Sequence, residues 1–289
     1  MRTVLVTGAR GQLGRHLVNR GTAAGIPIRG VGSSEVDITD PQAVAAAVEP
    51  GCVVLNAAAY TAVDAAETDE ARAAAVNGTG PGVLATVCAD KGAHLVHVST
   101  DYVFAGDATE PYRIDAPTGP RTAYGRTKLT GERAVLERLP SAHVVRTAWV
   151  YTGEGTDFVA TMRRLEGERD ILSVVDDQRG CPTYARDLAD GLLELATRAD
   201  RIPGGILHAT NAGEATWFDL ARAVFEEIGA DPERVRPCGS DEFVRPAPRP
   251  TYSVLDGSAW IDAGLTPLRP WREALHEAII GDGTTPAVR

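Results

Sequence analysis

The sequence is short of cysteine, of long apolar runs and of positive charge. Its four cysteines are widely scattered, with no CxxC pair and no histidine spaced for a zinc site. This usage is typical of a reduced, cytoplasmic protein. No apolar stretch reaches the roughly 18 residues of a membrane helix, and the N-terminal run TVLVTGA is too short for a signal peptide. We therefore expect a cytoplasmic protein without a membrane partner.

The charge balance is acidic, with a formal net charge of -10 at pH 7. Proteins that bind nucleic acids usually carry a basic face, so we expect no nucleic-acid partner, although a local basic pocket for a small anion stays open. The 289 residues, of which 44% are hydrophobic, suffice for one large domain or for a large domain with a smaller one. Neither internal repeats nor low-complexity linkers interrupt the chain.

Short apolar runs alternate with alanine-rich helical segments through the first half of the chain. The runs lie at residues 3–7, 26–32, 52–59, 94–100 and 143–151. Continuous Val, Leu and Ile runs joined by helices predict a parallel sheet that is buried on both faces, with right-handed crossovers. The sequence therefore predicts an α/β fold of the Rossmann type, a doubly wound parallel sheet.

Beyond residue 151 the alternation loosens, which indicates a smaller α/β domain packed on the first. The segment ILSVVDD predicts a strand, YARDLADGLLELATRA a helix, and ATWFDLARAVFEEIGA a strongly amphipathic helix. The last segment, GDGTTPAVR, is expected to be frayed.

The first apolar run leads directly into a glycine-rich turn, TGARGQLG, in which Gly8, Gly11 and Gly14 follow the spacing GxxGxxG. Glycine permits a tight turn and a close approach of the backbone to a pyrophosphate, and the next helix directs its first N–H groups at that anion. Such turns are often only tight turns. A strand before it and a helix after it favour dinucleotide binding.

The other apolar runs end in residues suited to ligand contact. The third places Ala58, Ala59 and Tyr60 at its carboxyl end, and the fourth places Thr100 and Asp101 there. Ligands of open α/β sheets bind at this edge. Close packing alone would also explain the small residues of the third run.

The loop after the second run, GVGSSEVD, bears on the choice of cofactor. NAD sites usually carry a carboxylate here, whereas this loop offers Ser33, and Arg10 in the glycine turn is able to reach a 2′-phosphate. These features favour NADPH. In the alternative, Arg10 is solvated and Glu35 turns inward, which would suit NADH. Asp37 and Ile38 are candidates to flank the adenine.

Tyr124 and Lys128 are four residues apart in YGRTKLTGE, a predicted helix, and therefore share one face. A tyrosine is a poor proton donor or acceptor near neutral pH unless a cation stabilises its phenolate, which Lys128 could do. Thr100 would supply a second hydroxyl that holds a substrate carbonyl. A lone YxxxK is usually structural, but its combination with the glycine turn favours a catalytic site.

These motifs together resemble the extended short-chain dehydrogenase/reductase superfamily. The longer strings NAAAYTAVDAAE, HVSTDYVFAG, SVVDDQRGCPT and RPAPRPTYSVLD resemble the dTDP-4-dehydrorhamnose reductase family, from Thr3 to about Trp271. The resemblance implies NAD(P)H-dependent reduction of the 4-oxo group of a dTDP-4-oxo-6-deoxysugar, for which dTDP-4-dehydro-β-L-rhamnose is the leading candidate. Another dTDP-deoxysugar stays open as substrate, and so does a non-catalytic NADP-binding subunit.

The resemblance also implies roles for individual residues. Tyr124 is the proton donor, Lys128 its partner, and Thr100 orients the carbonyl, while Asp101 and Trp149 line the sugar site. Gln12 and Leu13, in the GQLG string, belong to the cofactor turn by the same resemblance. We assign residues 1–150 to an NAD(P)-binding Rossmann domain, to which 182–203 returns, and residues 151–181 and 204–289 to a substrate-binding domain.

Two further side chains are candidates for substrate contact on physical grounds. Trp149, expected at the end of the fifth strand, could stack on a sugar or serve as a core residue. Arg249, in a Pro-rich loop, could pair with the diphosphate or form a surface ion pair. Gln178 and Arg179 are weaker candidates for substrate or dimer contact.

The sequence departs from the family at one place. The best-known branch holds magnesium between subunits through two glutamates, but the corresponding positions here read Arg15-His16 and Arg186-Asp187. Arginine cannot supply the oxygen ligands that magnesium requires. We therefore predict no metal site, and a monomer or a homodimer without the magnesium-bridged interface.

Overall fold

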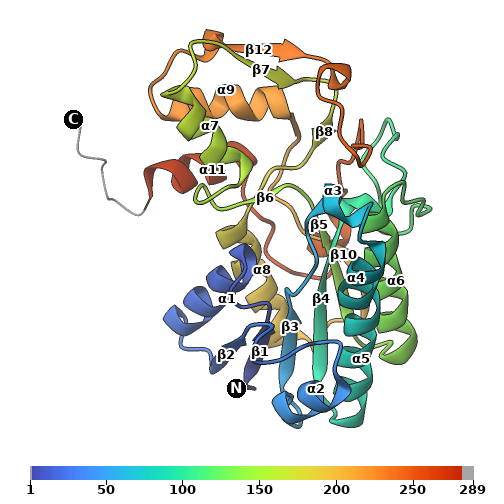
Figure 1. The fold of residues 1–289 in the computed structure, drawn as a ribbon. Helices are drawn as coiled ribbons and strands as arrows, with labels where there is room; N and C mark the ends of the chain where they lie inside the picture. Colours follow the sequence, from blue (N-terminus) through green and yellow to red (C-terminus); the bar gives the residue numbers. More distant parts are fainter. Residues whose placement is uncertain (1, 282–289) are drawn as a thin grey trace.

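Six parallel strands form the central sheet of the computed structural model, which describes residues 2–281 (Figure 1). In the order of the sheet, these strands are β10 (Gly205–His208), β5 (His143–Thr147), β4 (His94–Thr100), β3 (Val53–Asn56), β1 (Val4–Thr7) and β2 (Ile28–Val31). β1, β3 and β5 are buried along their whole length. The predicted doubly wound parallel sheet is therefore confirmed.

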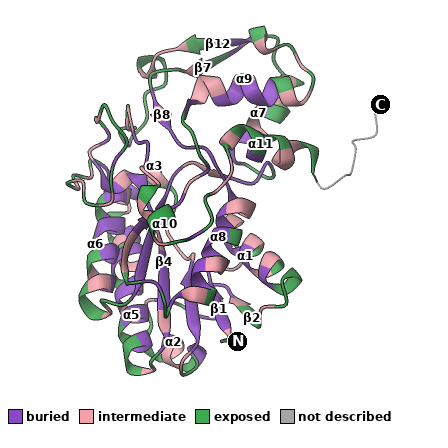
Figure 2. Cartoon of the chain, turned by 180° about the vertical axis from the view of Figure 1, so that it is seen from behind, coloured by how far each residue is buried: buried purple, intermediate pink, exposed green. Residues whose placement is uncertain are grey.

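Helices cover both faces of this sheet, and the strands between them are the most buried part of the chain (Figure 2). One face packs against α1 (Gln12–Ala23), α8 (Ala185–Arg198) and α10 (Ser258–Asp262). The other packs against α2 (Pro41–Ala47), α5 (Gly80–Asp90) and α6 (Ala123–Arg138). Fully burying one Leu or Val side chain stabilises a fold by about 1.5–3 kcal/mol, so these two layers hold the sheet rigid.

The sheet has its topological switch point at β1, because β2 lies on one side of this strand and β3 on the other. The crevice at such a point is the usual ligand site of open α/β sheets. The segments that follow β3 and β4 lie at this edge of the sheet. They are α3 (Val63–Ala66), α4 (Glu70–Ala74), the π-helix η1 (Ala75–Thr79) and the short 3-10 helix η2 (Asp101–Val103).

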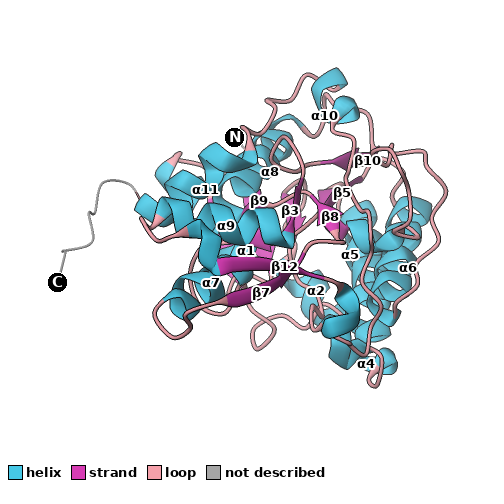
Figure 3. Ribbon diagram, turned by 90° about the horizontal axis from the view of Figure 1, so that it is seen from above, coloured by secondary structure: helices cyan, strands magenta, loops and turns pink. Residues whose placement is uncertain are grey.

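A smaller lobe lies beyond this edge of the sheet (Figures 1 and 3). Its helices are α7 (Phe158–Glu166), α9 (Trp217–Glu227) and α11 (Trp271–Ile280), with the 3-10 helices η3 (Pro232–Arg234) and η4 (Ser240–Glu242). Its strand pairs are β7 (Leu172–Val175) with β12 (Val235–Cys238), β6 (Val150–Tyr151) with β9 (Thr183–Tyr184), and β8 (Arg179–Gly180) with β11 (Ala215–Thr216). Val159, Val224 and Leu275 anchor its core.

The amphipathic helix of this lobe begins where the sequence predicts. Thr216 accepts a hydrogen bond from the Asp219 N–H, and Asp219 accepts one from the Thr216 N–H, which together form a capping box. Leu220 and Val224 then face the lobe core.

Two expectations about the second half of the chain need correction. β10 was expected in the substrate-binding part, 204–289, but it pairs with β5 in the central sheet, and Trp260 of α10 is buried in the core beside α8. The apolar run at 143–151 is also not one strand. It breaks after Thr147, because Trp149 takes a left-handed backbone angle of φ 48°. Residues 282–289, which include nearly all of the segment expected to fray, lie outside the described part.

Candidate active site

The glycine turn after β1 needs glycine at two positions, Gly8 and Gly14. Gly8 has φ 70°, and a Cβ added there would lie 2.6 Å from the Ala58 backbone nitrogen. A Cβ on Gly14 would lie 2.2 Å from the Gly8 carbonyl oxygen. The turn therefore fits tightly against the segment after β3. The next helix starts at Gln12, and no side chain caps its N-terminus. The backbone N–H groups of Gln12 and Leu13 are therefore placed to bind an anion.

The loop after β2 holds both a cation and a carboxylate. Arg10 Nη2 lies 3.2 Å from Glu35 Oε2, and the same oxygen accepts the Gly32 N–H at 2.7 Å. That backbone hydrogen bond and Arg10 hold the pKa of Glu35 below its usual value. Ser33 is exposed beside them. Arg10 is therefore paired with Glu35 at the surface, an arrangement that matches neither of the two alternatives drawn from the sequence.

Asp37 and Ile38 have different surroundings. The Asp37 carboxylate accepts hydrogen bonds from the backbone N–H of Thr39, at 2.9 Å, and from its hydroxyl, at 2.8 Å. Ile38 is buried against the helix layer near Gly80. The side chain of Asp37 is therefore engaged within its own turn, whereas Ile38 gives the loop an apolar anchor.

Asn77 organises the edge next to Ala58 and Ala59, and sequence reasoning missed it. It lies in the π-helix η1, where the wider turn carries its side chain to Tyr60. Its Oδ1 accepts the Tyr60 N–H at 2.8 Å, and its Nδ2 donates to the Tyr60 carbonyl at 3.1 Å. An asparagine within an alanine-rich helical run was the only available signal.

The structure brings Tyr124 beside Thr100 through the close approach of α6 to η2. Thr122 caps α6 by accepting the Gly125 N–H at 3.0 Å, and a Cβ on Gly125 would lie 2.2 Å from the Tyr102 carbonyl oxygen. Only glycine allows this contact, which puts the first turn of the helix against the end of β4. The Thr100 hydroxyl lies close enough to the Tyr124 phenol there to lower its pKa.

Lys128 lies one turn further along α6, with 2% of its surface exposed. Its Nζ donates to the Val98 carbonyl at 2.7 Å. Burial lowers the pKa of Lys128 to about 8, although Glu132 works in the opposite direction. Burial raises the pKa of Tyr124 to about 12, although the neighbouring Thr100 hydroxyl works in the opposite direction. The phenol is therefore protonated near neutral pH and able to donate its proton.

Asp101 completes this part of the site. Its Oδ1 accepts the Thr100 hydroxyl at 2.9 Å, while its Oδ2, Ser99 Oγ and Thr147 Oγ1 are buried without a hydrogen-bond partner among the described residues. Burial raises the pKa of Asp101 to about 6. Buried polar atoms without partners are rare because they cost free energy, so a ligand hydroxyl would be a favourable partner here.

Trp149 lies in the break between β5 and β6 and not at the end of a strand. Its ring stacks on Trp217, with the centroids 3.6 Å apart and an angle of 5° between the planes. A Cβ on Gly180 would lie 2.6 Å from its Cε2. Because Trp217 covers one face of the indole, only the rest of the Trp149 ring could contact a sugar.

Arg249 forms an ion pair across the site. Both of its Nη atoms donate to the Asp64 carboxylate of α3 at 2.8 Å, and Nη1 also donates to the Ala247 carbonyl. This bidentate pair attaches the Pro-rich loop to the edge of the central sheet. Gln178, the other loop candidate, is buried and donates to Ser240 Oγ at 2.7 Å.

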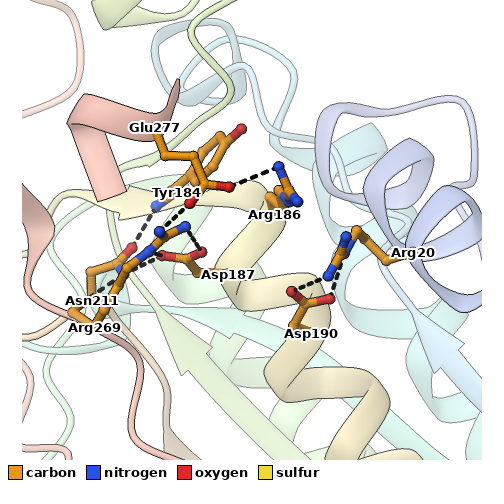
Figure 4. Close-up of polar contacts among 8 residues, drawn as sticks. All are labelled: Arg20, Tyr184, Arg186, Asp187, Asp190, Asn211, Arg269 and Glu277. Carbon is orange, nitrogen blue, oxygen red and sulfur yellow. Dashed lines mark hydrogen bonds and ion pairs between the residues drawn. The ribbon is translucent and has the colours of Figure 1, made fainter. Parts of the chain in front are cut away.

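Arg186 and Asp187, one of the two pairs that the sequence analysis compared with magnesium ligands, form ion pairs within the chain (Figure 4). Arg186 pairs with Glu277 at 2.7 Å, Asp187 pairs with Arg269 at 2.5 Å, and Asn211 donates to Asp187. No group of three or more His, Cys, Asp or Glu side chains within residues 2–281 could hold a metal ion. In the same range, no helix combines the length and apolar character needed to cross a membrane.

Known proteins are similar to this chain over nearly its whole length. The family described as RmlD substrate binding domain matches residues 1–281. A dTDP-4-dehydrorhamnose reductase of Mycolicibacterium smegmatis is 55% identical over 278 residues, which is 96% of this chain and 84% of that protein. A probable dTDP-4,6-dihydroxy-2-methyloxan-3-one 4-ketoreductase of Streptomyces antibioticus is 54% identical over 280 residues, which is 95% of this chain and 93% of that protein.

A solved structure is similar over nearly the whole chain. It is the dTDP-4-dehydrorhamnose reductase of Bacillus anthracis in complex with NADP, with a TM-score of 0.90 and 34% identity. The match covers 97% of this chain and 99% of that one.

Proposed function

The chain belongs to the dTDP-4-dehydrorhamnose reductase family, and from this premise we propose that it reduces the 4-oxo group of a dTDP-4-dehydro-6-deoxy-L-hexose with NADPH. The substrate that we assign is dTDP-4-dehydro-β-L-rhamnose, and the product is dTDP-β-L-rhamnose. The observation that carries the proposal is the placement of the Thr100 and Tyr124 hydroxyls side by side, at the same sheet edge as the glycine turn. NADH is the alternative cofactor.

The glycine turn supplies a fitting cradle for the dinucleotide. Gly8 and Gly14 leave backbone where any side chain would collide, and the uncapped helix N-terminus at Gln12 and Leu13 offers N–H groups to a pyrophosphate. Arg10 would hold a 2′-phosphate in place of Glu35. When bound, the nicotinamide supplies a hydride to the carbonyl carbon.

Tyr124 donates the proton that balances this hydride. Its phenol O–H passes a proton to the 4-oxo oxygen, so the ketone becomes a secondary alcohol. Thr100 holds and polarises the same oxygen, since its hydroxyl lies beside Tyr124. Lys128, buried one turn away, stabilises the phenolate that remains.

The sugar and its diphosphate would lie between the sheet edge and the smaller lobe. Asp101 has a buried, unpartnered Oδ2 for a sugar hydroxyl, and Trp149 would offer the part of its ring that Trp217 leaves uncovered. Arg249 would meet the diphosphate while Asp64 holds its guanidinium in place.

A second candidate substrate is another dTDP-4-oxo-deoxysugar. The Streptomyces relative described above, at 54% identity, is named as a probable 4-ketoreductase of a different dTDP sugar. The test is to incubate the purified chain with NADPH and each dTDP-4-oxo sugar and to identify the product by NMR. We expect dTDP-β-L-rhamnose from the first sugar. Turnover of only another sugar would replace the substrate that we assign, and NADPH binding without turnover of any sugar would favour a regulatory subunit.

The cytoplasmic location, the absence of a nucleic-acid partner and the oligomeric form without magnesium stay predictions from the sequence.

A further inference from the structure

A row of buried polar side chains crosses three neighbouring strands of the central sheet. Thr7 of β1, Asn56 of β3 and His97 of β4 occupy paired positions, because Thr7 pairs with Asn56 and Asn56 pairs with His97 in the strand register. None of the three is more than 1% exposed. Buried polar groups destabilise a fold unless they are hydrogen-bonded, so the partners of this row decide what it does.

The hydrogen bonds of Asn56 fix the orientation of its amide. Thr7 Oγ1 donates to Asn56 Oδ1 at 2.7 Å, and the Ala58 backbone N–H donates to the same atom at 3.1 Å. A backbone N–H can only donate, so this atom is the oxygen. The amide nitrogen therefore points the other way, where it lies 2.9 Å from Nδ1 of His97.

This arrangement determines which nitrogen of His97 carries the hydrogen. The Asn56 amide nitrogen is only a donor, so His97 Nδ1 accepts. Burial lowers the pKa of His97 well below its usual value, which makes the ring neutral. A neutral imidazole that accepts at Nδ1 carries its hydrogen on Nε2.

Nε2 of His97 lies 3.4 Å from Lys128 Nζ. Along the row, the hydrogens of Thr7, Asn56 and His97 all point toward Lys128, so the positive ends of these dipoles face the amine. A neutral amine can accept the Nε2–H, whereas an ammonium has no lone pair with which to accept it. The only acceptor that the described contacts give Lys128 is the Val98 carbonyl.

We propose that His97, held by Asn56 and Thr7, is a positioning residue that controls the protonation of Lys128 from the interior of the sheet. The inference rests on the proposed function, in which Lys128 acts beside Tyr124. The row turns an N–H toward the amine and so makes its third proton easier to release. Lys128 is then able to return a proton to the Tyr124 oxygen near neutral pH after each turnover.

Other charged side chains near Lys128 are either neutralised by a partner or placed away from its amine. On α6, Glu132 lies one turn beyond Lys128 and favours the ammonium, but both of its oxygens bind Arg146 of β5, at 2.9 and 2.7 Å. The charge of Asp101, in η2, raises the pKa of Tyr124. On the outer side of α6, Glu67 accepts the Ala123 N–H and Glu70 pairs with Arg126.

The pH profile of NADPH-dependent reduction tests this inference. In the wild type, kcat/KM should fall as pH rises through about 8, because Lys128 then loses its charge. His97→Gln places an amide oxygen near the former Nε2, which accepts from the ammonium. Asn56→Asp has no hydrogen for Nδ1, so the ring carries its hydrogen there and turns a lone pair toward Lys128. Each variant should move the alkaline limb upward by roughly half to one pH unit.

His143→Gln is the matched control, since His143 is also fully buried in the sheet but binds the Ile202 carbonyl outside the site. Its alkaline limb should stay at the wild-type position. An unchanged limb in both His97→Gln and Asn56→Asp, with thermal unfolding close to wild type, would refute the role of His97.

A second measurement needs no turnover. NMR of wild-type protein with isotope-labelled histidine should show that the neutral ring of His97 is protonated at Nε2, with its signal identified by its loss in His97→Gln. A ring protonated at Nδ1 would overturn the inference. Because no substrate is used, this result tests the role of His97 independently of turnover. A failure to reduce any dTDP sugar would contradict only the proposed function.

Discussion

Single side chains of this site carry the chemistry at a cost in stability. Asp101 is 2% exposed, and burial raises the pKa of its carboxyl group from 3.8 to about 6. Near neutral pH the group is ionised in the folded and the unfolded chain, so the full cost of burying the charge is present. As pH falls from about 6 toward 4, the folded form takes up the proton first, and stability rises.

Asp101→Asn should therefore stabilise the fold while it impairs reduction. At about 1.4 kcal/mol per pKa unit, the shift corresponds to about 3 kcal/mol, so we expect a gain of about 1–3 kcal/mol in the free energy of unfolding near neutral pH. Urea unfolding near pH 7 and near pH 5 measures it. The gain should shrink at the lower pH, where the wild type is protonated. A variant that is less stable near neutral pH would contradict the cost assigned to this carboxylate.

At the same scale, we expect Arg10 and Glu35 to decide the preference between NADPH and NADH. Arg10 is exposed and paired with Glu35, so a 2′-phosphate has to replace that carboxylate. Arg10→Ala should raise KM for NADPH roughly tenfold and leave KM for NADH nearly unchanged, because only NADPH loses a charge-assisted hydrogen bond.

Steady-state kinetics with both cofactors measures this preference. Arg15→Ala is the matched control, because Arg15 is an exposed arginine on α1, the helix that follows the glycine turn, and its loss should not affect the preference. An equal rise of both KM values in Arg10→Ala would show that Arg10 does not read the 2′-phosphate.

Between elements, one ion pair connects the two halves of the site. Arg249 in the Pro-rich loop binds Asp64 of α3 with both Nη atoms, and Ala247 donates its N–H to Asp64 at 3.2 Å. Arg245 lies further from the same carboxylate, at 3.9 Å. The Arg249 guanidinium is the bidentate part of this attachment, and lysine cannot reproduce its flat geometry.

Arg249→Lys should raise KM for the dTDP sugar roughly tenfold with a smaller effect on kcat, because the loop and the diphosphate lose a fixed guanidinium. Arg245→Lys, which keeps the same charge at the more distant position, should leave KM near the wild-type value. If Arg249→Lys changes thermal stability but not KM, the pair is structural and does not touch the substrate.

For the whole molecule, the periodicity of apolar runs was enough to predict the sheet and its helices, because strands buried on both faces need continuous apolar sequence. The same reasoning could not place β10, since four residues at 205–208 pair with a strand some sixty positions earlier. It also missed the break at Trp149, because a left-handed backbone at a tryptophan depends on the packing of Trp217 and Gly180.

The site was predictable to a similar extent. The glycine turn and the Tyr124–Lys128 spacing are local patterns, so they were visible in the sequence. The row of Thr7, Asn56 and His97 was not, because each residue lies on a separate strand and only the sheet register aligns them. Ion pairs such as Arg249 with Asp64 likewise join residues far apart in the sequence.

The most direct test of the central claim compares wild type with Tyr124→Phe for loss of NADPH absorbance with dTDP-4-dehydro-β-L-rhamnose, with NADPH affinity measured in parallel by fluorescence. We expect wild-type turnover to dTDP-β-L-rhamnose, and in Tyr124→Phe a loss of at least about 100-fold in kcat with NADPH binding retained, since the proton donor alone is removed. Wild-type activity in Tyr124→Phe would contradict the assignment of Tyr124 as proton donor.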